Sequence, residues 1–446
     1  MLTSTRFAGQ RFAVLGLARS GLTSVASLVA GGAEVTAWDA REDARDKVAD
    51  VATVADPLTI DLAGFAGVVV SPGVPLNRHP IAAHAAAFGV PVIGDIELLA
   101  QIRADLPPHR VVGITGTNGK STTTALVHHL CRAAGLPVRM GGNIGLPVLG
   151  EDALPAGGVY VLELSSYQID LTRSLACDIA VLINVSPDHL DRYDGFDAYA
   201  ASKERLFTMQ VAGQRAIFGQ GDPVTRAIAT RIAAQRASDV TIAAPDALPG
   251  QADWPSLQGP HNLENAAIAV AVAQALGIGE DVWRPALASF VGLPHRMERV
   301  ALADGVLFIN DSKATNPAST APALAAYPRV HWICGGLPKT DTLGECVPAF
   351  GHVVGAYVIG EAGPLFAELL GPYMPVVRSE MLCDAVRQAM IAAQPGDVVM
   401  LSPACASFDQ FRDFEARGDA FRQIVTMLIA DRDAACPPLP NSEGMT

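Results

Sequence analysis

The sequence has little positive charge, and this scarcity limits the partners that it can bind. Its 446 residues include 32 Lys and Arg against 45 Asp and Glu, a formal net charge of -13. Such a balance argues against nucleic acid or an anionic membrane as the main partner, although a local basic pocket for phosphates remains possible. No apolar run reaches the ~18 residues of a membrane helix. Near the N-terminus, Gly16, Arg19 and Gly21 interrupt the apolar run, which fits a strand, turn and helix better than a signal peptide.

Paired cysteines and aromatic side chains are also scarce. The seven cysteines are scattered and contain no Cys-x-x-Cys pair. This odd, dispersed set predicts free or buried thiols in a reducing compartment and excludes a disulfide framework or a cysteine zinc site. Aromatic residues make up 6% of the chain while hydrophobic residues make up 50%, so the cores are expected to consist of Ala, Val and Leu. We therefore expect a cytoplasmic protein.

Short β-branched runs alternate with helical segments along almost the whole chain, which predicts an α/β fold with mainly parallel sheets. At this length we expect three α/β domains. The breaks in the pattern place them at residues 1–102, 103–298 and 299–446, the first and last of them Rossmann-like. The tail, residues 436–446, contains Pro, Gly and polar residues without periodicity and is expected to be disordered.

A glycine turn follows the first predicted strand. Gly16 and Gly21 flank it, and Asp39 ends the next strand. The pattern nearly matches the dinucleotide fingerprint, but Ala18 stands where the middle glycine should lie. The turn could hold a phosphate or diphosphate at a helix N-terminus, with Asp39 facing a ribose, or it could be an ordinary strand–helix turn.

The stretch from Val111 to Thr123, "VVGITGTNGKSTT", is a stronger signal. A strand ends near Ile114, glycines free the backbone to point its amides inward, and Lys120 begins a helix. The spacing misses the usual phosphate-loop pattern by one residue. Backbone amides and the helix dipole should still bind phosphates, Lys120 should neutralise them, and the Ser121 hydroxyl should ligate Mg²⁺. The sequence therefore predicts a nucleotide site with a metal ion.

Further polar residues follow the next predicted strands. Glu163 ends the strand "VYVLEL", where a carboxylate is costly unless it is paired or bound to a metal, so Mg²⁺ ligation is the better interpretation. Asn184, Asp188 and His189 lie just past another strand end. A lone histidine is usually structural, but its position at the edge of the site makes a ligand role plausible.

Taken together, "GITGTNGKST", "ELSSYQ", "NVSPDHLDR" and "HNLENAAIA" resemble the Mur ligase family of ATP-dependent amide-forming enzymes. The family's loop departs from the generic pattern in the same way. Folylpolyglutamate synthases share a related central domain, so these motifs alone leave the substrate open. The resemblance implies an ATP site at Gly113, Thr115, Gly116, Thr117, Asn118, Gly119, Lys120, Ser121, Thr122, Asn262, Asn265, Arg296, Asp311 and Lys313.

The resemblance also implies the metal and catalytic groups. Glu163 and Ser121 would ligate one Mg²⁺ and His189 a second. Lys203 matches the lysine that the family carbamylates with CO₂, and its carbamate would bridge to the second ion; from the sequence alone it is expected to be a solvated helix lysine. Lys120, His189 and Lys203 are thus the implied catalytic residues. The implied contacts of Asn262 and Asn265 are with adenine, the alternative being helix capping.

The last third of the chain resembles the branch of the family that adds D-glutamate. "FINDSKATNP", "CGGLPKTD" and "LSPACASFDQFRDFEARG" each lie at the end of a strand and carry polar groups that suit an anionic substrate. The resemblance implies D-glutamate contacts from Thr315, Lys339, Ser407 and Phe408, where the backbone of residue 408 matters more than its ring. The implied second substrate is UDP-N-acetylmuramoyl-L-alanine, bound by Gly16, Arg19, Ser20, Asp39, Arg41, Ser71, Pro72, Gly73, Asn143 and His189.

In the implied reaction a substrate carboxylate attacks the ATP γ-phosphate, and an amine then attacks the acyl phosphate. No side-chain nucleophile is required. The alternatives that remain are another ligase of the Mur type, a folate polyglutamylating ligase, an NAD-dependent oxidoreductase, and a nucleotide-dependent switch. The enzyme is expected to act as a monomer.

Overall fold

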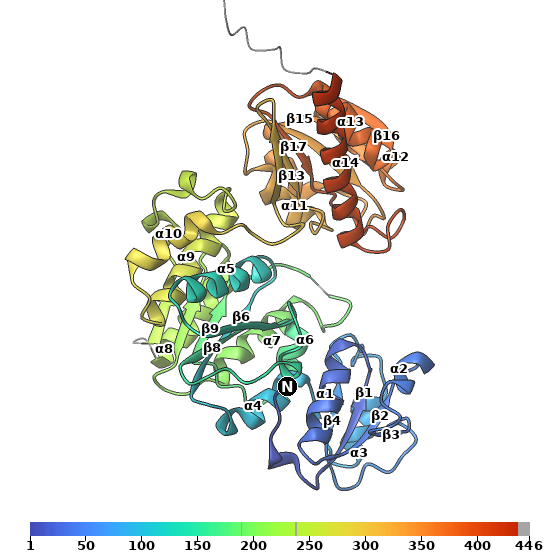
Figure 1. Cartoon of the computed structure of the whole chain (residues 1–446), viewed down its shortest axis with the longest axis vertical. Helices are drawn as coiled ribbons and strands as arrows, with labels where there is room; N and C mark the ends of the chain where they lie inside the picture. Colours follow the sequence, from blue (N-terminus) through green and yellow to red (C-terminus); the bar gives the residue numbers. More distant parts are fainter. Residues whose placement is uncertain (189, 237–238, 436–446) are drawn as a thin grey trace, which may run out of the picture. The chain divides into compact units, whose positions relative to one another are not determined.

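The computed structural model describes residues 1–188, 190–236 and 239–435. His189 and the tail at 436–446 lie outside the described residues. The chain folds as two compact units, Met1–Pro249 with Glu264–Leu287, and Gly250–Leu263 with Ala288 onward. The first unit contains two sheets and the second unit contains one (Figure 1). In the described part of the chain no helix is long and apolar enough to cross a membrane.

The first sheet is parallel, with the strand order β3-β2-β1-β4-β5. Its strands are β1 (Arg11–Leu15), β2 (Glu34–Trp38), β3 (Thr53–Val54), β4 (Phe65–Val70) and β5 (Val92–Ile93). The helices are α1 (Arg19–Ala30), α2 (Glu42–Asp46), α3 (Ile81–Ala87) and α4 (Asp95–Ile102). Successive side chains of a strand point to opposite faces. Thus Phe12 and Val14 pack in one buried cluster with α1 and α4, while Ala13 and Leu15 pack in another with α3.

The second sheet is also parallel, with the order β11-β10-β9-β6-β8-β7. Its strands are β6 (His109–Thr115), β7 (Val138–Gly142), β8 (Gly158–Glu163), β9 (Ile179–Leu182), β10 (Arg215–Phe218) and β11 (Val240–Ile242). The helices are α5 (Lys120–Ala133), α6 (Ser166–Asp170), α7 (Phe196–Thr208), α8 (Pro223–Arg236), α9 (Pro260–Ala275) and α10 (Glu280–Ser289). Because β9 and β8 flank β6, their carboxyl ends lie beside the loop that follows β6.

The third sheet has the order β12-β13-β17-β14-β15-β16. Its strands are β12 (Glu298–Ala303), β13 (Val306–Asn310), β14 (Val330–Gly335), β15 (Val353–Ile359), β16 (Val376–Glu380) and β17 (Val398–Leu401). The helices are α11 (Pro317–Leu324), α12 (Gly363–Leu370), α13 (Leu382–Ala392) and α14 (Phe414–Ala435). Side chains of α11 and α12 pack with Trp332 and Met400, whereas those of α13 and α14 pack with Ile333 and Leu401. Helices therefore cover both faces of this sheet (Figure 1).

The α/β fold with three mainly parallel sheets confirms the prediction of the fold class. One pairing was not predicted, the antiparallel hairpin of β12 and β13. Asp304 and Gly305 form its turn with φ values of 49° and 77°, and Asp-Gly is a common two-residue hairpin turn. The six cysteines in the described part of the chain are free, and all but Cys383 are buried, as the scattered spacing predicts.

Candidate functional site

The loop after β6 has the form of a phosphate-binding turn. Strand β6 ends at Thr115, and α5 begins at Lys120. Gly119 has a φ of 81°, and a Cβ there would lie 2.4 Å from Oδ1 of Asn265. The turn therefore requires glycine at this position. Ser121 is buried in the first turn of α5, where helix amides lack partners within the helix and attract anions.

The lysine of this loop curls back over it. Lys120 Nζ donates to the carbonyl oxygens of Gly116 at 3.0 Å and Thr117 at 2.7 Å. The ammonium group therefore lies on the loop between β6 and α5, next to the N-terminus of α5. This location suits a cation that neutralises a bound phosphate.

Three further residues predicted to belong to the loop are Gly113, Thr115 and Thr122, and packing explains the first of them. Gly113 lies within β6, where a Cβ would come 2.6 Å from Sγ of Cys177. Thr115 is fully buried at the end of the strand, and its hydroxyl has no hydrogen-bond partner in the described part of the chain. Thr122 follows Ser121 in α5 and is half-buried. The glycine at position 113 is thus explained by packing behind the loop.

The carboxylate predicted to bind a metal lies beside this loop. Glu163 ends β8, is 2% exposed, and its Oε1 accepts a hydrogen bond of 2.9 Å from Asn143 Nδ2. Its other oxygen, Oε2, is buried and has no hydrogen-bond partner in the described part of the chain. A buried carboxylate oxygen without a partner is costly, and a hard divalent cation would satisfy it. The residues present therefore fit Mg²⁺.

Lys203 is buried, contrary to the solvated position that the sequence alone predicts. It lies on α7 with 1% of its surface exposed. Its Nζ donates to the Gly116 carbonyl oxygen at 2.8 Å and lies 4.5 Å from the centre of the Tyr199 ring. Burial, and then the charge of Lys120, hold the pKa of Lys203 well below its usual range, against the opposing effect of Asp188 and Asp170. The amine is thus biased towards its neutral, nucleophilic form.

The predicted second metal site is only partly described. His189 lies outside the described residues, and the neighbouring Asp188 acts electrostatically on Lys203. Among the residues that the structure describes, no three His, Cys, Asp or Glu side chains converge to hold a metal ion. The second ion therefore remains a prediction.

The two asparagines of α9 have different surroundings. Asn265 Oδ1 accepts a hydrogen bond of 3.1 Å from Thr123 Oγ1 and lies against Gly119. Asn262 Nδ2 donates to the carbonyl oxygen of Gln258 at 3.0 Å. Neither contact is the capping of a helix N-terminus by a side-chain oxygen. Asn265 belongs to the surroundings of the phosphate loop.

The first glycine turn is held by its own neighbours. Asp39 accepts the N–H of Leu17 at Oδ2 (2.7 Å) and that of Arg41 at Oδ1 (3.0 Å). Ser71 Oγ donates to the Gly16 carbonyl at 2.8 Å, so the ends of β1, β2 and β4 meet here. The predicted residues Pro72 and Gly73 follow Ser71 in the loop after β4, and Ser20 lies in the first turn of α1. These residues form one group at the carboxyl edge of the first sheet.

Arg19 connects this edge with the second sheet's loops. Its Nη2 donates to the carbonyl oxygen of Gly145 at 2.9 Å. Gly145 is two residues beyond Asn143, the residue that holds Glu163. The loop after β7 therefore contacts both the glycine turn, through Gly145, and Glu163, through Asn143.

In the second unit, two residues predicted to bind the same substrate are in contact. Lys339 Nζ donates to Thr315 Oγ1 at 3.2 Å, which joins the loop after β13 to the loop after β14. Ser407 is buried after β17, whereas Phe408 is 70% exposed. The strands β13, β17 and β14 are neighbours, so these three loops lie at one edge of the sheet. The expectation that the backbone of residue 408 matters more than its ring stays a prediction.

The residues predicted to reach the nucleotide from this unit lie at the same edge. Asp311 is buried, and it accepts hydrogen bonds from Ser402 Oγ at 2.9 Å and from the Met297 N–H at 3.1 Å. Burial raises its pKa to about 7, opposed by these hydrogen bonds and by the charge of Arg296. Lys313 Nζ lies 4.0 Å from the centre of the Phe414 ring. Phe414 lies in the stretch "LSPACASFDQFRDFEARG", but no role was predicted for it.

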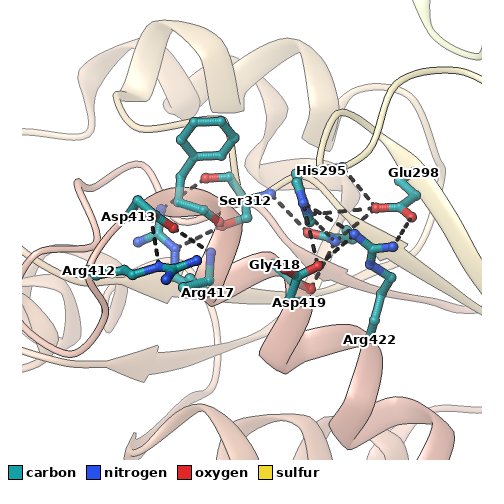
Figure 2. A network of polar contacts seen from close by, with 12 residues as sticks. His295, Glu298, Ser312, Arg412, Asp413, Arg417, Gly418, Asp419 and Arg422 are labelled. Atoms are coloured by element: carbon teal, nitrogen blue, oxygen red, sulfur yellow. Dashed lines mark hydrogen bonds and ion pairs between the residues drawn. The ribbon is translucent and has the colours of Figure 1, made fainter. Parts of the chain in front are cut away.

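A buried arginine that the sequence analysis missed ties two of these loops together (Figure 2). Arg417, on α14, is 1% exposed, and its guanidinium donates to Ser312 Oγ at 3.0 Å and to the Ser312 carbonyl at 2.9 Å. It also donates to the carbonyl oxygens of Cys405 and Ala406, both at 3.1 Å. The next residue is Gly418, where a Cβ would lie 2.1 Å from Nδ1 of His295. A glycine within a helix, next to an arginine, in "FEARGDAF" was the sequence feature that could have indicated close packing here.

Three family models match the chain in order. The Mur ligase MurD-like N-terminal domain matches residues 10–94, the Mur ligase middle domain residues 114–250, and the Mur ligase glutamate ligase domain residues 295–405. Each match contains one of the three sheets or most of it.

The chain is similar over almost its full length to curated proteins called UDP-N-acetylmuramoylalanine–D-glutamate ligase. It is 75% identical to the protein of Novosphingobium aromaticivorans, covering 98% of this chain and 99% of the relative. It is 60% identical to that of Sphingopyxis alaskensis, covering 96% and 100%. Among solved structures, the MurF ligase of Thermotoga maritima in complex with ADP aligns with a TM-score of 0.61 at 15% identity, covering 97% of this chain and 98% of that one. The last comparison shows a shared fold.

Proposed function

The chain belongs to the Mur ligase family, and we propose that it is the ATP-dependent ligase that joins D-glutamate to UDP-N-acetylmuramoyl-L-alanine. The reaction is a step of peptidoglycan precursor synthesis, which takes place in the cytoplasm. The choice of substrates rests on the near full-length identity to relatives with that name. The observation that carries the reaction class is the buried Lys203 amine, which shares the Gly116 carbonyl with Lys120. The same domain holds the buried Glu163 oxygen, which has no hydrogen-bond partner among the described residues.

The chemistry needs a carboxylate to become an electrophile. A free carboxylate is a poor electrophile, so the L-alanine carboxylate attacks the γ-phosphate of ATP and gives an acyl phosphate with release of ADP. Lys120 and the amides at the start of α5 would hold the phosphates and reduce their repulsion with the incoming carboxylate. When bound, Mg²⁺ supplies further screening of that charge, with Ser121 and Glu163 as its protein ligands.

The amine of D-glutamate then attacks the acyl phosphate and displaces inorganic phosphate, which leaves the amide. Lys339 and Thr315, with Ser407 and the backbone at Phe408, would bind the carboxylates of D-glutamate. No side chain forms a covalent bond with the substrate in either step. The protein's task is to position the substrates and to stabilise charge.

The other predicted residues complete the proposal. Gly16, Arg19, Ser20, Asp39, Arg41, Ser71, Pro72, Gly73 and Asn143 would bind the UDP-linked substrate, and Asn262, Asn265, Arg296, Asp311 and Lys313 the nucleotide. Lys203 would carry a carbamate: its neutral amine attacks the carbon of CO₂ and loses a proton. The low pKa that burial gives this lysine supports that step, and His189 and the carbamate would face a second Mg²⁺.

The test is phosphate release from ATP in the presence of UDP-N-acetylmuramoyl-L-alanine and either D- or L-glutamate. The proposal expects turnover that depends on both substrates and on the D-isomer. Turnover with L-glutamate or with a folate instead of the UDP-linked substrate would support a folylpolyglutamate-type ligase. Phosphate release that no added substrate changes would contradict both.

A further inference from the structure

The segment that follows β9 packs directly against the phosphate loop. A Cβ on Gly116 would lie 3.0 Å from Cβ of Ile183 and 3.3 Å from the nitrogen of Asn184. The Thr117 N–H donates to the Asn184 carbonyl oxygen at 2.9 Å. Thr117 Oγ1 also donates to Ser186 O at 3.1 Å and accepts from Ser186 N–H at 3.0 Å. The loop is therefore held along one side by residues 183–186.

Within this contact the side chain of Asn184 pairs with both backbone polar groups of one residue, Asn118. Its Oδ1 accepts the Asn118 N–H at 2.9 Å, and its Nδ2 donates to the Asn118 carbonyl oxygen at 3.3 Å. A primary amide has one acceptor and two donors, so it can satisfy both groups of a residue's backbone. Asn184 is half-buried, so water competes with these bonds less than at an exposed site.

This pairing changes which loop amides face a phosphate. The N–H groups of Thr117 and Asn118 are directed to Asn184. The carbonyl oxygens of Gly116 and Thr117 accept from lysine ammonium groups. Of the N–H groups of residues 117–121, those from Gly119 onward, at the start of α5, are therefore the ones left to meet an anion, and residues 117 and 118 are fixed by Asn184.

We propose that Asn184 is a positioning residue of the phosphate loop, and that its amide holds the backbone N–H and C=O of Asn118 so that the loop has its nucleotide-binding shape before the nucleotide arrives. This inference rests on the nucleotide-binding part of the proposed function and not on the identity of the amide substrates. Preorganisation of this kind lowers the entropy that binding must remove. Its loss should weaken nucleotide binding more than it weakens the fold.

The experiment measures the Kd of ADP with Mg²⁺ by calorimetry on the full chain, together with the Tm of each variant. Asn184→Ala should raise the Kd about tenfold, the size expected for a lost hydrogen-bond pair. Asn184→Asp should raise it more at pH 8, because a carboxylate oxygen then faces the Asn118 carbonyl oxygen. As the pH falls towards about 4, near the ordinary pKa of an Asp carboxyl, the group takes up a proton and can donate again, so the ratio of variant to wild-type Kd should fall.

The matched control is Gln210→Glu. Gln210 also donates its amide to two backbone carbonyls, those of Cys177 and Arg215, in the same domain. These carbonyls lie at the starts of β9 and β10, at the sheet edge opposite the phosphate loop. This variant should lose Tm without a change in the Kd of ADP and without a pH-dependent ratio.

Two results would overturn the proposal. One is an Asn184→Ala variant that binds ADP as the wild type does. The other is an Asn184→Asp variant whose Kd, relative to that of the wild type, is the same at every pH. Protonation restores the hydrogen-bond donor of the proposed contact, whereas it would not repair a general loss of fold. Failure of the D-glutamate reaction in the phosphate-release test, with ADP binding intact, would contradict the proposed substrates and leave this inference standing.

Discussion

The ammonium groups of Lys120 and Lys203 donate to the same atom, the carbonyl oxygen of Gly116, at 3.0 and 2.8 Å. Two cations on one acceptor repel each other, and the burial of Lys203 adds a desolvation cost to its charged form. Both effects lower the pKa of Lys203. The geometry therefore favours one ammonium, on Lys120, and one neutral amine, on Lys203. Conversion of that amine to a carbamate would replace the repulsion with attraction.

Replacing Lys203 should abolish the reaction in a way that small carboxylic acids can partly reverse. Lys203→Ala removes the amine and leaves a space beside Gly116, which formate or acetate could enter to supply the carboxylate of a carbamate. We expect less than about 1% of wild-type turnover without the acid, a loss of several kcal/mol in transition-state binding, and a dose-dependent gain with it. The measurement is phosphate release.

The control for Lys203 is Lys47→Ala, which changes an exposed lysine after α2. It should keep full turnover and show no response to formate. Full activity of Lys203→Ala without any added acid would remove the carbamate from the mechanism.

Replacing Glu163 by Gln should weaken Mg²⁺ binding without lowering the stability of the fold. The Gln Oε1 can still accept from Asn143 Nδ2, while Oε2, which has no hydrogen-bond partner among the described residues, is replaced by a neutral NH₂ group. We expect the Mg²⁺ concentration for half-maximal turnover to rise about tenfold or more, with a Tm equal to or above that of the wild type because a buried charge is gone.

Glu264→Gln tests whether any shielded carboxylate of this domain would do the same, since Glu264 is half-buried. Glu264 Oε1 accepts the backbone N–H groups of Gln220 and Gly221, and the amide oxygen of glutamine can still accept both, so the Tm should change little. Its Mg²⁺ dependence should stay that of the wild type. An unchanged Mg²⁺ requirement in Glu163→Gln would show that Glu163 is not a ligand.

The sequence predicted three mainly parallel α/β sheets, because hydrophobic periodicity and glycine turns are local signals. It did not predict the order of the strands within each sheet. The strands that end at Thr115, Glu163 and Leu182 were all placed by such runs. The sequence could also predict that loops after parallel strands meet at one edge. It thus predicted that Lys120 and Glu163 lie at the same edge of one sheet.

Other features depend on contacts between distant segments, which no local pattern encodes. Lys203 sits in an amphipathic helix in which a lysine is normally solvated, and only packing against the phosphate loop buries it. Arg417 is an ordinary helix residue by spacing, yet its guanidinium binds carbonyls of residues 312, 405 and 406. The role of Asn184 required the distance to Asn118.

The contact between Lys339 and Thr315 predicts a specific effect on D-glutamate. Thr315→Val keeps the shape of the side chain but removes the hydroxyl that accepts from Lys339 Nζ at 3.2 Å. The KM for D-glutamate should rise about tenfold, as one polar contact to a charged ligand is lost, while the KM for ATP changes little. Thr315→Ser retains the hydroxyl and should behave as the wild type. Equal KM values for the Val and Ser variants would contradict the role of the hydroxyl.

The third domain should lose stability in acid through Asp397, which is buried at the start of β17. Its carboxylate accepts from Arg329 Nε at 2.6 Å, from His331 Nε2 at 3.0 Å and from the Gln394 N–H at 3.1 Å. Burial acts to raise its pKa, but these partners outweigh burial and bring the pKa to about 2. A carboxyl whose pKa is lower in the folded state stabilises the fold above its unfolded pKa of about 3.9 and loses that effect as the pH falls towards 2.

Asp397→Asn tests this directly by thermal unfolding between about pH 7 and pH 3. At neutral pH the variant should be less stable than the wild type by about 2 kcal/mol, the free energy equivalent to the lowered pKa. The difference should shrink as the pH falls below about 4, because the wild-type carboxylate is then losing its own advantage. Arg329→Lys, which keeps a charge on a half-exposed side chain, should show a smaller loss with the same pH trend. A Tm difference for Asp397→Asn that is constant across this range would mean that the carboxylate acts only through its shape and hydrogen bonds, and not through its charge.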